Sequence, residues 1–324
     1  MATEIHEQLT KYLTDAHSIE EQALAQLRDA PDIAGDAELA QAFRDHLTET
    51  EGHERRIREL LEARDAKPSR VKDTVMSVGA KGFLLFARLQ PDTPGKLAAH
   101  ALSYEGLEVA SYELLARVAE RAGEQEVAEA ARSIRDEERQ MMERLESGFD
   151  KSVDASLREL QPDDLQEQLR KYLADAHAIA EQAIALLERA PEIAGSEELA
   201  ALYADHLTET RDHAEAITAR LGTLGGDTST LTDAALRLGA LNWGAFFQGH
   251  PDTGGKLAAF AYAFEHLEIG GYEQLKRVAQ RAGDDETVAL AERILGEERT
   301  AAERIAAHFD EAATVALEQQ GVAG

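Results

Sequence analysis

The sequence predicts an all-α protein made of two tandem four-helix bundles, each with a crossover helix between its second and third long helices. Alanine, leucine, glutamate and arginine dominate and only 5% of residues are aromatic, which favours helices over sheets. The second half also repeats the first, since EQLTKYLTDAH from Glu7 returns as EQLRKYLADAH from Glu167, an ungapped offset of 160 residues. A period this long indicates duplicated domains rather than a solenoid. We therefore expect one domain over residues 1–160 and a second over residues 161–324.

Proline, glycine and capping residues mark the expected helices of the first copy. Pro31 should end the first helix, Thr93 and Pro94 should open the third, and Gly123 should end it. A separate helical stretch over residues 70–89 is interpreted as the crossover helix. The four long helices are expected at about residues 3–30, 37–64, 93–122 and 124–156.

Charge and composition narrow the classes of function. The chain has 62 acidic and 34 basic residues and a formal net charge of −28, which disfavours binding to nucleic acid or to an anionic membrane surface. No apolar run is long enough to span a membrane, and the N-terminus does not resemble a signal peptide, so we expect a cytoplasmic protein. Because there is no cysteine, any metal ion must be held by oxygen and nitrogen ligands.

Acidic and imidazole side chains interrupt the apolar stripe of every long helix in the first copy. In the second helix, His46, Glu49 and His53 follow the helical spacing and share one face. Taken singly, such a histidine is more often a hydrogen-bonded core residue, and such a glutamate is more often partly exposed. Inward acids on four helices together favour a metal site. The candidate ligands of the first copy are Glu20, His46, Glu49, His53, Glu105, Glu108 and Glu138.

A cluster of buried carboxylates needs compensating charge. Burying one unpaired carboxylate costs several kcal/mol, and several together repel one another unless cations or shared protons neutralise them. A pair of metal ions neutralises them directly, and a four-helix bundle can build such a dinuclear site from inward carboxylates and histidines. An oxygen-rich ligand set with few imidazoles suits iron or manganese better than a closed zinc site.

The second copy keeps most of these positions but loses one. Ala180 stands where the first copy has Glu20, and the neighbouring Glu181 lies about 100° around the helix. We therefore expect the second copy to bind metal more weakly than the first, or not at all. Its candidate ligands are His206, Glu209, His213, Glu265, Glu268 and Glu298.

The chain resembles the YciE/YciF-type ferritin-like family of bacterial stress-associated proteins. The resemblance covers nearly all of each copy and rests on DAHSIEEQAL (15–24), LAQAFRDHLTETEGHERRI (39–57), EGLEVASYELLARVAERAG (105–123) and DEER (136–139). It implies ferritin-like bundles, a dinuclear metal centre and a link to stress responses. It places ligands at Glu20, at Glu49 with His46 or His53, and at the acids of the last two helices. The E-x-x-H spacing usual in ferritin-like proteins is absent here.

Two functions from different classes follow. The first is a dinuclear iron or manganese protein, an oxidase or peroxidase, whose partners are metal ions and oxygen or peroxide. The alternative is a non-catalytic stress-associated bundle that works through protein partners or assembly. Tandem fusion makes a ferritin-like shell of many subunits hard to close, so we expect the two halves to pair as a pseudo-dimer, with a homodimer as a further step.

Overall fold

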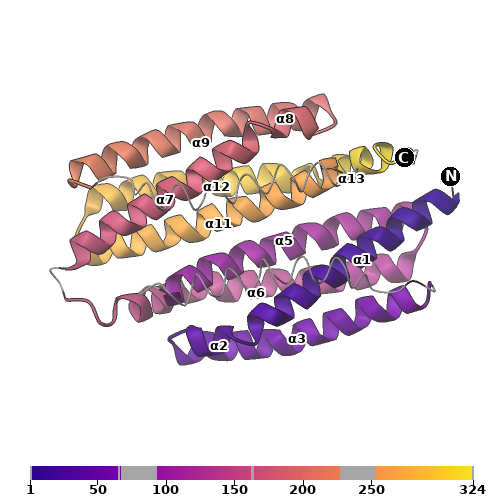
Figure 1. Cartoon of the computed structure of the whole chain (residues 1–324), viewed down its shortest axis with the longest axis horizontal. Helices are drawn as coiled ribbons and strands as arrows, with labels where there is room; N and C mark the ends of the chain where they lie inside the picture. The colour runs from indigo at the N-terminus through magenta and orange to yellow at the C-terminus, as the bar shows by residue number, and fades with distance from the viewer. Residues whose placement is uncertain (1, 65, 67–92, 162–163, 227–252, 323–324) are drawn as a thin grey trace. The chain divides into compact units, whose positions relative to one another are not determined.

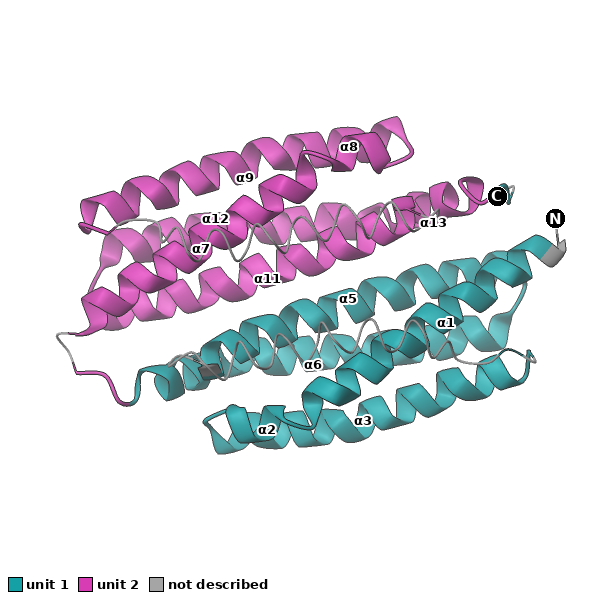
Figure 2. Ribbon diagram, in the orientation of Figure 1, with its two compact units in different colours: residues 1–158, 321–324 teal, residues 159–320 magenta. Residues whose placement is uncertain are grey.

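The protein is all-α throughout the part of the chain that the structure describes, so the predicted fold class is confirmed at this level. The computed structural model describes residues 2–64, 66, 93–161, 164–226 and 253–322. No strand occurs among these residues. The chain divides into two compact units, shown in Figure 2: unit 1 comprises residues 1–158 and 321–324, and unit 2 comprises residues 159–320.

Unit 1 is a bundle of long helices with one short helix at a connection. Helix α1 packs against α3 and α5, and α6 packs against the same two helices, so each long helix has two long neighbours (Figure 1). The helices are α1 (Ala2–Leu27), the short α2 (Ala30–Ile33), α3 (Ala37–Glu62), α5 (Thr93–Arg121) and α6 (Gln125–Leu157).

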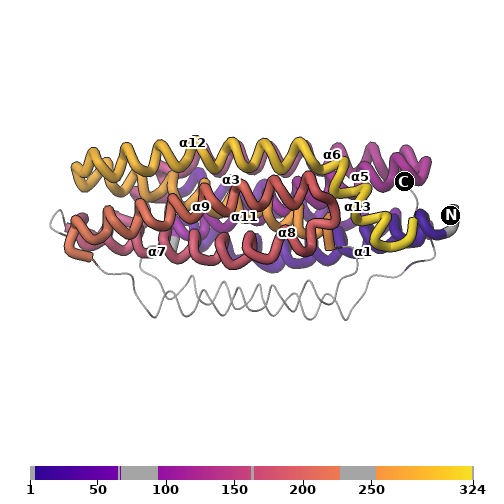
Figure 3. Tube along the Cα trace, turned by 90° about the horizontal axis from the view of Figure 1, so that it is seen from above, coloured from indigo at the N-terminus to yellow at the C-terminus, as the bar shows by residue number. Residues whose placement is uncertain are grey.

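Unit 2 repeats this arrangement, with one difference. Helix α7 packs against α9 and α11, and α12 packs against the same two, and the long helices run side by side along the unit (Figure 3). The last helix of unit 1 is continuous, whereas its counterpart breaks at His308 into α12 and α13. The helices are α7 (Leu165–Leu187), α8 (Ala190–Ile193), α9 (Glu197–Thr223), α11 (Thr253–Ala282), α12 (Asp285–Ala307) and α13 (Phe309–Glu318).

The helix boundaries follow local chemistry, with one departure from the prediction. Helix α1 ends at Leu27, earlier than expected, because the chain starts the separate helix α2 around Pro31. Proline fits the first turn of a helix, where its missing N–H is not needed. Asp36 caps α3 as its side chain accepts hydrogen bonds from the backbone N–H of Glu38 and Leu39. The predicted crossover helix at residues 70–89 lies outside the described residues.

The apolar faces of the long helices form the interior of each unit. In unit 1, Leu13, Ile57 and Leu115 are at most 1% exposed, and Leu173 and Leu275 are equally buried in unit 2. This burial supplies the main driving force for packing the helices together. None of the described helices is both long and apolar enough to cross a membrane.

Two glycines of unit 1 have the same backbone conformation, but only one of them is closely packed against other residues. Gly35 and Gly123 both have positive φ, at 69° and 75°. A Cβ on Gly35 would lie 2.9 Å from Ala155 Cβ and from Pro94 Cγ, whereas a Cβ on Gly123 would meet nothing within 4 Å. We expect Gly123→Ala to lower the free energy of unfolding by about 1 kcal/mol through backbone strain alone. Gly35→Ala should lower it clearly more, because the added Cβ also meets neighbouring atoms. Thermal unfolding of the full chain, followed by circular dichroism, measures both, and equal losses would contradict the packing at Gly35.

Candidate metal centre

The long helices of unit 1 bring acidic and imidazole side chains to the middle of the bundle. His46 and His53 lie two turns apart on one face of α3, and Glu105 and Glu108 lie one turn apart on α5. Glu20 on α1 and Glu138 on α6 lie next to these side chains. Each of the following side chains is at most 4% exposed: Glu20, His46, His53, Glu105, Glu108 and Glu138.

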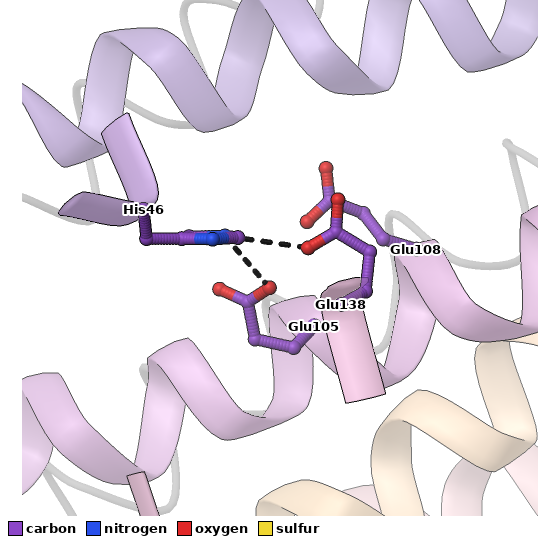
Figure 4. A group of neighbouring side chains, drawn as sticks. All are labelled: His46, Glu105, Glu108 and Glu138. Atoms are coloured by element: carbon purple, nitrogen blue, oxygen red, sulfur yellow. Dashed lines mark ion pairs between the residues drawn. The ribbon is translucent and has the colours of Figure 1, made fainter. Parts of the chain in front are cut away.

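The first group of candidate ligands comprises His46, Glu105, Glu108 and Glu138. One ligand atom from each lies within 4.8 Å of the others. The Nε2 atom of His46 is 3.1 Å from Glu105 Oε2 and 3.3 Å from Glu138 Oε2. Figure 4 shows the imidazole pointing from α3 toward the three carboxylates. The group could hold one metal ion.

The second group comprises Glu20, His53 and Glu138, and it shares Glu138 with the first. His53 Nδ1 lies 2.8 Å from Glu138 Oε1 and 3.9 Å from Glu20 Oε1. Glu138 therefore presents its Oε1 atom to His53 and its Oε2 atom to His46. A carboxylate placed in this way can bridge two neighbouring metal ions.

The donor atoms of both groups fit metal ions because they lack other partners. Among the described residues, no hydrogen bond of acceptable geometry reaches His46 Nε2, His53 Nδ1, either oxygen of Glu108 or Glu138, or Glu20 Oε2. The two imidazoles meet the inner carboxylates only through the short ion-pair contacts described above. Buried polar atoms are normally paired, so an unpaired cluster requires an explanation. Cations at the two groups would satisfy all of these atoms together.

Glu49, which the sequence suggested as a ligand, lies in neither group. Its carboxylate contacts the opposite ring atom of His46, with Glu49 Oε2 3.0 Å from His46 Nδ1. Arg144 donates two hydrogen bonds to the same carboxylate, at 3.0 and 3.1 Å. Glu49 is thus placed to orient the imidazole and to keep Nε2 facing the cluster, as carboxylates behind metal-binding histidines commonly do.

The sequence did not identify the partners of the other polar side chains around the centre. The Tyr112 hydroxyl donates a hydrogen bond to Glu20, and Glu137 Oε2 lies 2.9 Å from His53 Nε2. Tyr112 lies at helical spacing from Glu108, and Glu137 adjoins Glu138 in the sequence, but spacing alone does not say which side chain a polar group meets across the bundle. These residues and Arg144 surround the candidate ligands.

Burial and mutual repulsion shift the proton affinities of the cluster. Burial, together with the charge of Glu138, raises the pKa of the Glu20 carboxyl to about 8. Burial also raises the pKa of Glu105 to about 7 and that of Glu108 well above its ordinary value. Burial alone would lower the pKa of His53, but Glu138 and Glu20 raise it to about 9. In the absence of cations, protons hold this cluster together.

Unit 2 contains a counterpart of the first group. Ligand atoms of His206, Glu265, Glu268 and Glu298 lie within 4.8 Å of one another, and His206 Nε2 is 3.0 Å from Glu265 Oε2. All four side chains are at most 2% exposed. As in unit 1, the remaining candidate Glu209 lies behind the histidine, 3.1 Å from His206 Nδ1.

No counterpart of the second group is found among the described residues of unit 2. Ala180 is fully buried at the position of Glu20. His213 lies 2.9 Å from Glu298, but no third acid joins them to form a group. Glu181 does not replace the missing acid, because its side chain is about a third exposed and lies nearest to His177.

The raised pKa values predict that the metal-free protein loses stability as pH rises. A group with a raised pKa binds its proton more tightly when folded, so its contribution is lost between the unfolded and folded pKa values. For Glu20 this window runs from 4.5 to about 8, and for His53 from 6.5 to about 9. We expect the metal-free chain to melt at a lower temperature at pH 9 than at pH 6.

Replacing Glu20 by glutamine should reduce this dependence, because the amide has no proton to lose. Bound metal ions should also reduce it, since cations take over from protons. Melting curves of metal-free and metal-loaded protein across this pH range provide the measurement. A metal-free melting temperature that increases from pH 6 to pH 9 would contradict the assigned shifts.

Comparison with known proteins agrees with the internal repeat. The sequence model of the family described as "Domain of unknown function (DUF892)" matches residues 4–158 and again residues 164–318. No solved structure gives a significant match to the chain. The two matches span nearly the whole sequence, the first includes both groups of unit 1, and the second includes the group of unit 2. The chain therefore belongs to the DUF892 family and contains two tandem copies of its domain.

Proposed function

We propose that unit 1 is a ferritin-like four-helix bundle that holds two iron or manganese ions, and that the loaded centre reacts with oxygen or peroxide in a stress response. The observation that carries this proposal is the position of Glu138. It lies between two groups of buried donor atoms and presents one oxygen to each. Two ions sharing one carboxylate is the arrangement that these contacts favour.

The two groups divide the ligands between the ions. His46, Glu105 and Glu108 would hold the first ion, Glu20 and His53 would hold the second, and Glu138 would bridge them. The four carboxylates carry four negative charges, which two divalent cations balance. Such neutralisation removes the repulsion that otherwise disfavours their burial.

The nature of the ligands favours iron or manganese. Four carboxylates and two imidazoles form an oxygen-rich set, whereas closed zinc sites use four ligands and often thiolates. Iron or manganese, when bound, would supply the electrons exchanged with oxygen or peroxide. The protein's contribution is to hold the ions, to orient the imidazoles and to exclude bulk water.

Residues of this chain support those tasks. The Glu49 carboxylate, held by Arg144, orients His46, and Tyr112 holds Glu20 by a hydrogen bond. A small pocket between α1, α3 and α5 is lined by Tyr104 and by Glu105 of the first group. The link to stress rests on the resemblance to YciE/YciF-type proteins.

Metal binding is tested with two matched substitutions on α5. Glu108 and Glu113 are both buried, but Glu108 belongs to the first group, whereas Glu113 pairs with arginines, among them Arg135 and Arg139. We expect protein purified without chelators to contain iron or manganese, Glu108→Gln to lower that content markedly, and Glu113→Gln to leave it unchanged. Elemental analysis of the three proteins provides the measurement.

Stopped-flow mixing of the ferrous form with oxygen and with peroxide then tests reactivity. We expect an absorbance change in the parent chain and in Glu113→Gln, and a much slower change in Glu108→Gln. Protein that takes up no metal and shows no oxidation would overturn the proposal and favour a bundle that acts through protein partners.

The position of Glu49 predicts an indirect effect on metal affinity. Carboxylates behind metal-binding histidines typically change affinity by about 10–100-fold. We therefore expect Glu49→Gln to weaken binding by about that factor while the metal count at saturation stays the same. Glu51→Gln, an exposed substitution on the same helix, is the control. Titration with manganese(II) measures both, and a lower saturating count for Glu49→Gln would instead make Glu49 a ligand.

A further inference from the structure

We infer that unit 2 holds a single metal ion, in the group of His206, Glu265, Glu268 and Glu298, and that the position of the second ion is lost there. The inference rests on the proposed function, because it takes the two-ion centre of unit 1 as its reference. It differs from a simple loss of binding in unit 2, which the alanine at position 180 by itself suggests.

The first group of unit 2 is equipped for one ion. Among the described residues, no hydrogen bond of acceptable geometry reaches Glu265 Oε2, either oxygen of Glu268, or Glu298 Oε2. These side chains are at most 2% exposed, and their ligand atoms lie within 4.8 Å of one another. Buried, unpaired oxygens facing a common centre are the same signature that unit 1 shows.

The second position of unit 2 lacks its acid, and a neighbour shows the consequence. In unit 1 the Tyr112 hydroxyl donates to Glu20. In unit 2 the hydroxyl of the corresponding Tyr272 is buried and has no hydrogen-bond partner among the described residues. Ala180 is likewise buried, so no donor atom takes the place of the missing carboxylate.

The histidine of this second position lacks the third acid that unit 1 provides. In unit 2, His213 Nδ1 makes a hydrogen bond of 2.9 Å with Glu298 Oε1, and His213 Nε2 lies 2.5 Å from Glu297. Both ring nitrogens and the inner carboxylate oxygen are therefore occupied. In unit 1 His53 makes the same two contacts, with Glu138 Oε1 at 2.8 Å and Glu137 Oε2 at 2.9 Å, but Glu20 Oε1 also lies 3.9 Å from its Nδ1 atom. Among the described residues of unit 2 no third acid joins His213 and Glu298, so these two side chains satisfy each other without enclosing a second ion.

Charge counting leads to the same result. The four buried carboxylates of unit 1 balance two divalent cations, but unit 2 has only the three carboxylates of Glu265, Glu268 and Glu298. Three carboxylates cannot balance two divalent cations in a buried site, where uncompensated charge is costly. A single divalent cation leaves no excess positive charge.

The test is to load the full metal-free chain with manganese(II), to count bound ions by equilibrium dialysis with elemental analysis, and to record the EPR spectrum. Ions that share a carboxylate are magnetically coupled, so their spectrum differs from that of an isolated ion. We expect about three ions per chain, with one coupled pair and one isolated ion. Glu268→Gln should remove the isolated signal and lower the count to about two, leaving the coupled pair intact.

A reciprocal pair of substitutions exchanges the two units. Glu20→Ala should lower the count to about two and remove the coupled signal, and it should fold because Ala180 already occupies this position in unit 2. Ala180→Glu should raise the count to about four and add a second coupled pair. If this variant does not fold, Glu20→Ala and Glu268→Gln still decide the matter.

The outcomes separate the inference from the proposed function. A second coupled pair in the unaltered chain would overturn the inference, as would an isolated signal that Glu268→Gln leaves unchanged, or no isolated signal at all. Absence of any coupled pair, with an isolated signal that Glu268→Gln removes, would overturn the two-ion centre of unit 1 and leave the single site of unit 2 standing.

Discussion

The electrostatics of buried carboxylates govern the arrangement of this protein. Unit 1 encloses four glutamates on three helices, and among the described residues no arginine pairs with their inner oxygens. Such a cluster is stable only with protons or cations between the acids, and the raised pKa values of Glu20, Glu105 and Glu108 express this requirement. The same requirement makes the cluster a candidate site for cations.

The bundle meets this requirement by dividing the ligands among its helices. One helix turn can place two acids side by side, as α5 does with Glu105 and Glu108, but ligands around a common centre must come from several directions. A ring of contacts then fixes the ligands from outside. Glu49 with Arg144, Glu137 and Tyr112 each contact a ligand on the side away from the cluster or at its edge. The polar interior is thus built in two layers within an apolar core.

Duplication has left the two units with different interiors on similar helices. A single replacement, Ala180 for Glu20, removes one ligand and one hydrogen-bond acceptor, and the neighbouring contacts change with it. Tyr272 lacks the carboxylate partner that Tyr112 has, and among the described residues no third acid joins His213 and Glu298. Two candidate sites with different ligand sets in one chain therefore allow the effect of Glu20 to be compared within a single protein.

Helix content, the repeat and the candidate ligands could all be predicted from the sequence, because each depends on periodicity or composition along the chain. The spacing of His46 and His53 on α3, for example, already places both imidazoles on one face. What the sequence could not supply was contact across the bundle. Glu49 lies at helical spacing from both histidines, yet its carboxylate contacts Arg144 and the Nδ1 atom of His46. The position of Glu138 between His46 and His53 likewise depends on how four helices rotate and pack against one another. The same holds for the hydrogen bond that Tyr112 makes and Tyr272 lacks, and for the contact of His213 with Glu298. Side-chain periodicity is a local property of one helix, whereas the meeting of donor atoms at a point is set by packing between helices, and for that reason only the tertiary structure decided it.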